Sequence, residues 1–234
     1  MFPGALADRQ KGRGMVTRIE YQKEMTLLHQ EIIRMGATVE NAISEAIRAL
    51  VDMDEAKARQ VIEQDDIVDE MERTIDHHCV AIIARQQPVA SDLRDVTSTL
   101  KLITDLERIA DHASDISERI LEICKNSERI AVPHDIVTMT GLAQNMLRGS
   151  LDSYVSRSEE QALAVVGMDV KVDELYNRLK TYLVHLMTVD PANVGQLVEM
   201  LQICKYVERI ADHAQNVAEW VLYYVKGRRV GHNG

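Results

Sequence analysis

The chain has 234 residues, of which 46% are hydrophobic and 27% charged, and a formal net charge of −10. This composition is typical of a folded soluble protein, and the length allows one large domain or two of about 115 residues. The negative charge excludes nucleic acid as the main partner, because phosphate contacts need a clustered positive surface. No apolar run is long enough to span a membrane, and the three cysteines lack C-x-x-C spacing, which is typical of a reduced, cytoplasmic protein.

The two ends of the chain are expected to lie outside the fold. Residues 1–18 contain a proline and three glycines without hydrophobic periodicity, so we predict a disordered extension. Residues 227–234 are rich in glycine and basic residues and are predicted to form a frayed tail.

Three long helices are predicted between these points in the first half. Apolar residues recur at helical spacing over residues 19–53, and Asp54 can cap a second helix that runs to about Gln86. A proline ends that helix, Ser91 can cap a third one, and the third helix ends near Lys125. Because short turns place sequential helices side by side, an antiparallel three-helix bundle is expected.

The same pattern starts again after a polar, proline-containing stretch at residues 126–133. A shift of 104 residues aligns Asp65 with Asp169, and after a short gap a shift of 101 aligns the heptapeptide ERIADHA at 107–113 with its identical copy at 208–214. The duplication predicts an all-α fold of two tandem, pseudo-symmetric, antiparallel three-helix bundles. We place them at residues 19–126 and 127–226.

Acid-x-x-x-acid pairs are the sharpest chemical signal in both halves. Residues four apart on a helix are neighbours, and at 100° per residue the acids of each heptapeptide lie about 140° from the apolar face, outside the core. The second helix of each half carries its own pair on the flank of its buried stripe. If adjacent helices turn these flanks toward one another, four carboxylates converge in each half. These are Asp65, Asp69, Glu107 and Asp111, and then Asp169, Asp173, Glu208 and Asp212.

Converging carboxylates repel one another unless a cation neutralises them. Oxygen-rich sites suit iron, manganese, magnesium, calcium or zinc, and the sequence does not select among these ions. The alternative is an ordinary solvated acidic face on an acidic protein. Metal binding is favoured because the pairs recur on two helices of each half.

Two histidines, His112 and His213, follow the second acid of each heptapeptide. They could be metal ligands or phosphoacceptors, but hydrogen-bonded packing between helices is the favoured interpretation. The phosphoacceptor pattern H-x-x-K-G is absent, and the Glu-x-x-His spacing of di-iron bundles is absent too.

The turn between the second and third helices carries Arg85 and Arg94, and Arg94 has no counterpart in the second half. An arginine there is usually a cap or a salt-bridge partner, but these two also form a candidate partner surface. No nucleophile elbow, phosphate-binding loop or dinucleotide fingerprint appears in the sequence, so we expect no catalysis.

Taken together and in order, the motifs resemble those of the PhoU family over residues 19–225. They are D-x-x-V-D-x-M-E, R-Q-Q-P-V-A-S-D-L-R, L-E-R-I-A-D-H-A and V-E-R-I-A-D-H-A. Where the family often has glycine, Ala110 and Ala211 stand in this sequence, which leaves the carboxylate spacing intact.

The resemblance implies surface metal clusters, with iron or zinc, on the eight acids named above. It also implies a cytoplasmic negative regulator of the phosphate regulon that links the ATPase of the phosphate transporter to a phosphate-sensing histidine kinase. Such a protein reaches the membrane through its partners only, and we expect a homodimer.

Two other hypotheses remain at this point. The acidic pairs could serve metal storage or phosphate-metal handling for its own sake. A phosphohydrolase that uses the clustered metals is the weakest alternative, because no general base or phosphate-binding arginine pair is evident.

Overall fold

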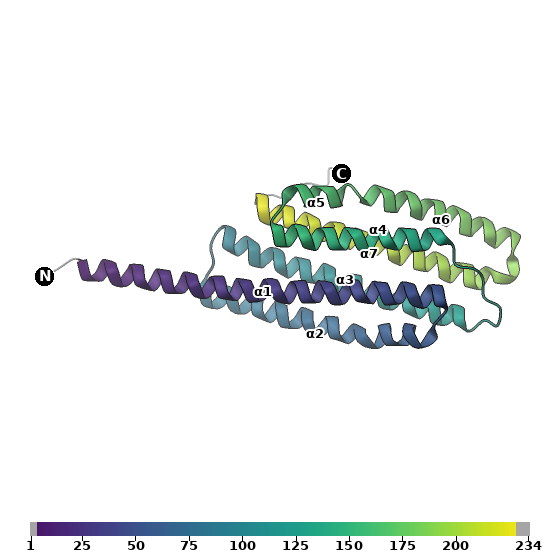
Figure 1. Ribbon diagram of the computed structural model, residues 1–234, viewed down its shortest axis with the longest axis horizontal. Coiled ribbons are helices and arrows are strands. Elements are labelled where there is room, and N and C mark those ends of the chain that lie inside the picture. Colours follow the sequence, from purple (N-terminus) through teal and green to yellow (C-terminus); the bar gives the residue numbers. More distant parts are fainter. Residues whose placement is uncertain (1–3, 228–234) are drawn as a thin grey trace.

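The structure is a computed structural model that describes the backbone of residues 4–227 and the side chains from residue 18 onward. Its elements are α1 (Gly4–Asp52), α2 (Glu55–Gln86), α3 (Ser91–Cys124), α4 (His134–Ser156), α5 (Glu159–Val166), α6 (Asp169–Val189), the 3₁₀ turn η1 (Pro191–Asn193) and α7 (Val194–Lys226). Helices α1 to α3 form one bundle, and α4, the α5–α6 pair and α7 form the second (Figure 1). The predicted fold class is therefore confirmed.

The predicted ends of the fold are only partly covered by the described residues. Helix α1 begins at Gly4, but the side chains before residue 18 lie outside the described part, so the disordered extension over residues 1–18 stays a prediction. Of the predicted tail at 227–234, only Gly227 is described. The predicted domain boundary falls in the connection between α3 and α4 and also stays a prediction.

Two helix starts test the capping predictions. Asp54 does cap α2, since its Oδ1 accepts a hydrogen bond from the backbone amide of Lys57 at 3.0 Å. The prediction for Ser91 is wrong by one residue: Ser91 is the first residue of α3, and the capping position belongs to Ala90, which offers no side-chain oxygen.

The middle helix of the second bundle is interrupted, whereas α2 is continuous. Helix α5 ends at Val166, and α6 starts at Asp169 after Gly167 and Met168. The amides of Gly167 and Met168 bond to Leu163 and Val165, which closes α5 with its own carbonyls. Sequence periodicity did not reveal this interruption, because apolar spacing continues across it.

The two bundles meet along α3 and α7, with a further contact between α1 and α4. The apolar faces that the heptapeptides share explain this layout: Leu106 and Ile109 of α3, and Val207 and Ile210 of α7, are all fully buried. Residues spaced three and four apart fall on one helical face, and that face is driven out of water. The duplicated segments therefore form the centre of the molecule.

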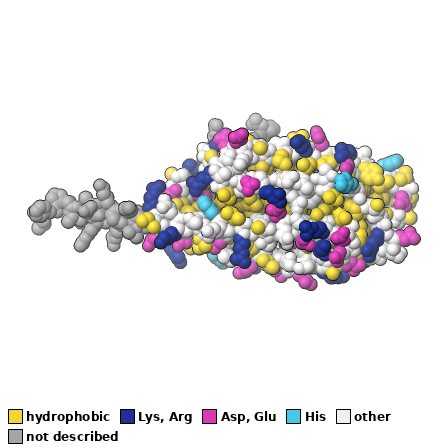
Figure 2. Space-filling view, in the orientation of Figure 1, with side chains coloured by type: hydrophobic (Ala, Val, Ile, Leu, Met, Phe, Trp, Pro, Cys, Tyr) yellow, Lys and Arg dark blue, Asp and Glu magenta, His cyan; other side chains and the backbone are white. Residues whose placement is uncertain are grey.

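The outer surface mixes charges of both signs. On the face shown in Figure 2, basic and acidic side chains are interspersed, with hydrophobic side chains between them. None of the described helices combines the length and apolar character needed to cross a membrane.

Candidate metal centre

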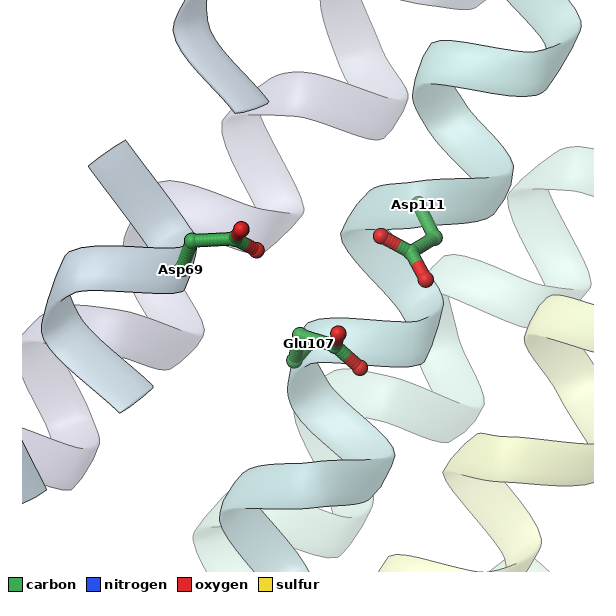
Figure 3. A group of neighbouring side chains, drawn as sticks. All are labelled: Asp69, Glu107 and Asp111. Carbon is green, nitrogen blue, oxygen red and sulfur yellow. The ribbon is translucent and has the colours of Figure 1, made fainter. Parts of the chain in front are cut away.

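Three carboxylates meet between α2 and α3 in the first bundle. Asp69 reaches from α2 toward Glu107 and Asp111, which lie one turn apart on α3 (Figure 3). One oxygen from each of the three lies within 4.8 Å of the other two. The predicted convergence of two helix flanks is thus present in the geometry, and this donor set of carboxylate oxygens fits a hard cation.

Burial and the crowded negative charge of this cluster raise the pKa values of two of its carboxyl groups. Burial, and then the charges of Asp111 and Asp69, raise the pKa of Asp65 to about 6, and a hydrogen bond with Ser114 only partly offsets this. Burial and then Asp111 also raise the pKa of Glu107. Asp65 therefore belongs to the same electrostatic cluster as the three converging acids, and a cation there would relieve the repulsion.

Two arginines lie at the edge of this first cluster. Arg108 Nη1 donates to Asp111 Oδ2 at 2.8 Å, and Arg73 Nη2 donates to Asp69 Oδ2 at 3.3 Å. Both guanidinium side chains are more than half exposed, so each can swing into solvent at small energetic cost. Glu107 Oε2 is buried and lacks a hydrogen-bond partner among the described residues, and Arg108 Nε lies 3.4 Å from it as an ion-pair partner.

The second bundle brings its acids together between α6 and α7. Burial, then Asp173, Asp212 and Glu208, raise the pKa of Asp169 to about 6. Burial and then Glu208 raise the pKa of Asp212. Electrostatically the four predicted acids form a cluster, as in the first half. Within the described part of the chain, however, only the first cluster brings three oxygens within 4.8 Å of one another.

A lysine accounts for part of this difference between the halves. Lys205 Nζ lies 2.6 and 2.5 Å from the two oxygens of Glu208, so an ammonium group already neutralises that carboxylate. The register of 101 residues places Thr104 at the equivalent position of α3, and Thr104 Oγ1 donates to the carbonyl of Leu100 instead. Lys205 also lies over the ring of Tyr176 at 5.3 Å.

The acids of the heptapeptides face a neighbouring helix and not open water. Only 22% of the side chain of Glu107 and 13% of that of Glu208 are exposed. These acids lie outside the core, as predicted, but they do not point into open water, because α2 and α6 cover the flanks of α3 and α7.

The histidines lie at the contact between α3 and α7, where they make hydrogen bonds. His213 Nδ1 is 2.8 Å from Asp105 Oδ1, and His112 Nδ1 is 3.2 Å from Asp115 Oδ2. The two imidazole rings are 5.6 Å apart between centroids. Burial lowers the pKa of His112, and its bond to Asp115 does not compensate fully. Both residues have the packing role that the sequence favoured.

Asp105 of α3 also accepts bonds from two further side chains of α7. Asn216 Nδ2 and Trp220 Nε1 donate to its oxygens at 3.2 and 3.0 Å. Asp105 therefore links the two bundles.

The two arginines of the predicted partner surface differ in exposure. Arg85 is exposed on the last turn of α2. Arg94 is half-buried, and its guanidinium lies over Gly227 at the end of α7. Their role in partner binding stays a prediction.

Sequence reasoning missed two further members of the clusters. Glu72 has its pKa raised by burial and then by Asp76 and Asp69, so it belongs to the rim of the first cluster. Its three-residue spacing from Asp69 could have revealed it. In the second half, Lys205 lies three residues before Glu208, and this spacing could have revealed the ion pair between them.

The chain is all-helical and made of two repeats, each with an acidic cluster between two of its helices. The model of the PhoU domain matches this chain twice, at residues 32–120 and 136–221. The chain belongs to the PhoU family, whose members are non-catalytic regulatory proteins. This membership confirms the expectation that it is not an enzyme.

Curated relatives and solved structures agree with this assignment. A "Phosphate-specific transport system accessory protein PhoU homolog" of Clostridium acetobutylicum is 40% identical, over 93% of this chain and 100% of the relative. The accessory protein PhoU of Escherichia coli is 34% identical, over 92% of this chain and 89% of its own length. The crystal structure of PhoU from Pseudomonas aeruginosa superposes with a TM-score of 0.85 at 36% identity and covers 89% of this chain and 100% of its own.

Proposed function

We propose that this protein is a non-catalytic adaptor of phosphate-specific transport that acts as a negative regulator of the phosphate regulon. It would couple the ATPase of the phosphate transporter to a phosphate-sensing histidine kinase in the cytoplasm, as a homodimer. The observation that carries the proposal is the match of both halves to the PhoU domain, since relatives over most of this length are named accessory proteins of phosphate-specific transport.

The partner proposal is tested by capturing each partner separately. The full chain is expected to retain the transporter ATPase and the cytoplasmic part of the kinase in pull-downs, and the retained amount should change with phosphate supply. Arg85→Ala removes an exposed charge next to the α2–α3 turn and should weaken one of the two captures. Arg59→Ala, an exposed arginine on the same helix, is the matched control. Failure to retain either partner under any phosphate condition would overturn the proposal.

We further propose that the first cluster binds a cation, with iron or zinc as the expected ions. Asp69, Glu107 and Asp111 would supply oxygens, and Asp65 would add a fourth. The ion would supply the positive charge that lets α2 and α3 hold their acids together. Asp169, Asp173, Glu208 and Asp212 would form the weaker site of the second bundle, because Lys205 competes there.

Elemental analysis of the purified protein tests the metal proposal directly. Asp111→Asn keeps the shape of the side chain, removes one negative charge and should lower the bound metal of the first site at least tenfold. Asp152→Asn, an exposed acid of α4, is the matched control and should keep the wild-type metal content. Equal metal in wild type and Asp111→Asn would refute this site.

The second candidate function is metal storage, which the acidic clusters themselves favour. A double variant that combines Asp111→Asn with Asp212→Asn distinguishes metal storage from the adaptor function. A protein that loses its metal and still represses the regulon would use the clusters for something other than signalling.

A further inference from the structure

A groove of about 460 Å³ lies between α1 and α2 on the surface of the first bundle. The two helices run side by side (Figure 1), and α2 packs against α1 and α3. None of the residues that line the groove belongs to the acids proposed to bind metal. The groove is therefore a separate surface feature of the first bundle.

The α2 side of the groove carries an apolar stripe. Ile67, Met71 and Ile75 line it at intervals of four residues, so they share one face of the helix. Ile75 is fully buried and Met71 half-buried, whereas 52% of Ile67 is exposed. An exposed isoleucine that continues an apolar stripe beside a groove is typical of a contact surface, because a partner that covers it removes apolar area from water.

The rim of the groove is mainly acidic. Four charged side chains line it, three of them acidic, and these are Glu31, Arg34, Asp66 and Glu70. Glu31 Oε2 is 2.8 Å from His78 Nδ1 inside the bundle, whereas Asp66 and Glu70 are exposed on α2. Complementary charge directs association, so this rim favours a partner segment with positive charge.

The internal repeat shows how the second bundle fills the equivalent groove. The register of 104 residues aligns Glu31 with Asp135 and Thr74 with Arg178. Arg178 Nε donates to Asp135 Oδ2 at 3.0 Å from α6 to α4, and both residues line a smaller groove of about 340 Å³. In the first bundle the short side chain of Thr74 stands at the place of this guanidinium. The first groove thus stays open where the second bundle inserts its own arginine.

We propose that the groove between α1 and α2 binds an amphipathic helix of a partner protein. Its apolar side chains lie on the stripe of α2, and an arginine or lysine points to Glu31, in the place that Arg178 takes in the second bundle. A helix seated between two antiparallel helices adds a fourth member to the bundle, with apolar contacts at helical spacing. The proposal rests on the adaptor function proposed above and gives the chemistry of the segment by which a partner binds.

Two substitutions close the groove with the residues of the second half. Thr74→Arg introduces the guanidinium of Arg178, and Ile67→Lys introduces the lysine that stands at position 171. Both positions are exposed, so the fold should be retained, and circular dichroism checks this. Thr181→Arg, at an exposed threonine of α6, is the matched control for an added surface charge.

A labelled peptide tests the groove without any natural partner. The probe is a helical peptide of about 18 residues, or five turns, with leucines along one face and arginines beside them. A peptide of the same composition in scrambled order is its control. In fluorescence anisotropy with the full chain, Thr74→Arg and Ile67→Lys should each weaken binding at least tenfold, and Thr181→Arg should not change it. A peptide that binds the wild type and Thr74→Arg equally, or binds neither, would overturn the groove.

Capture of the transporter ATPase and of the kinase with the same variants separates the groove from the adaptor function. Weaker capture of one partner by Thr74→Arg, with Thr181→Arg unchanged, supports the proposal. Capture of both partners at the wild-type level by Thr74→Arg overturns it and leaves the adaptor function standing. A peptide that binds the groove, together with no capture of either partner, supports the groove and overturns the adaptor function alone. A dimer that Thr74→Arg converts to monomers in sedimentation would assign the groove to a second copy and overturn the proposal.

Discussion

The difference between Lys205 and Thr104 makes a direct prediction about the two acidic clusters. Lys205→Thr removes the ammonium group that lies 2.5 and 2.6 Å from the oxygens of Glu208. Thr104→Lys introduces an ammonium at the equivalent place beside Glu107. We expect the first substitution to strengthen cation binding in the second bundle, and the second to weaken it in the first.

The size of the effect follows from the charge and the exposure of the lysine. Two unit charges 4 Å apart interact with about 1 kcal/mol in water and about 4 kcal/mol at an effective dielectric constant of 20. Because 41% of the side chain of Lys205 is exposed and it can swing away, the lower end of this range applies. A change of about 1.4 kcal/mol, or tenfold in affinity, is therefore expected for each substitution.

Calorimetric titration of the metal-free protein with Zn²⁺ resolves the two sites. The wild type should show a stronger and a weaker site, Lys205→Thr should bring their affinities together, and Thr104→Lys should weaken the stronger one. Lys180→Thr, an exposed lysine of α6, controls for the loss of a surface charge. Two sites of equal affinity in the wild type, unchanged by Lys205→Thr, would refute the reasoning.

Two further predictions concern stability. Burial lowers the pKa of His78, but hydrogen bonds of 2.8 Å with Glu31 and Glu24 raise it more, so the net shift is upward. The charged imidazole of His78 therefore stabilises the fold fully below about pH 6.5, and this stabilisation is lost as pH rises through the pKa of the folded state. His78→Gln should lower the free energy of unfolding in urea by about 1 kcal/mol at pH 6 and by little at pH 9. Asp105→Ala removes an acceptor shared by three side chains of α7, among them Trp220, and should cost about 2–3 kcal/mol while changing the fluorescence of this single tryptophan.

Each of these predictions has a matched control. His77→Gln changes an exposed neighbour of His78 and should leave the pH dependence of unfolding as it is. A pH-independent loss of stability in His78→Gln would contradict the assigned ion pairs. Asp152→Ala controls for the loss of an exposed acid, and an Asp105→Ala protein with wild-type stability would mean that the contact between α3 and α7 does not depend on this carboxylate.

The fold could be predicted from the sequence because its information is local and repeated. Apolar spacing of three and four residues fixed the buried faces of the helices, and the duplicated heptapeptide revealed the two halves. The residues of the first cluster were predicted for the same reason, since i,i+4 spacing determines which carboxylates are neighbours on one helix.

What the sequence did not reveal depends on contacts between distant segments. The cover that α2 gives to Glu107 cannot be read from the wheel of α3 alone. The neutralisation of Glu208 by Lys205 depends on the rotamers of both side chains. The break at Gly167 was missed because a single glycine within a helical pattern does not decide between a continuous and an interrupted helix.

That break gives the two bundles different mechanical properties. Helix α2 is one hydrogen-bonded rod of 32 residues, about 48 Å long at 1.5 Å per residue, so a push on its Pro88 end moves Asp65 and Asp69 as a unit. In the second bundle, Asp169 is the first residue of α6 and stands at the joint itself. Bending there would change the separation between Asp169 and the acids of α7 directly. The α2 acids of the first cluster thus lie within one continuous helix, whereas Asp169 of the second cluster lies directly after the interruption at Gly167 and Met168.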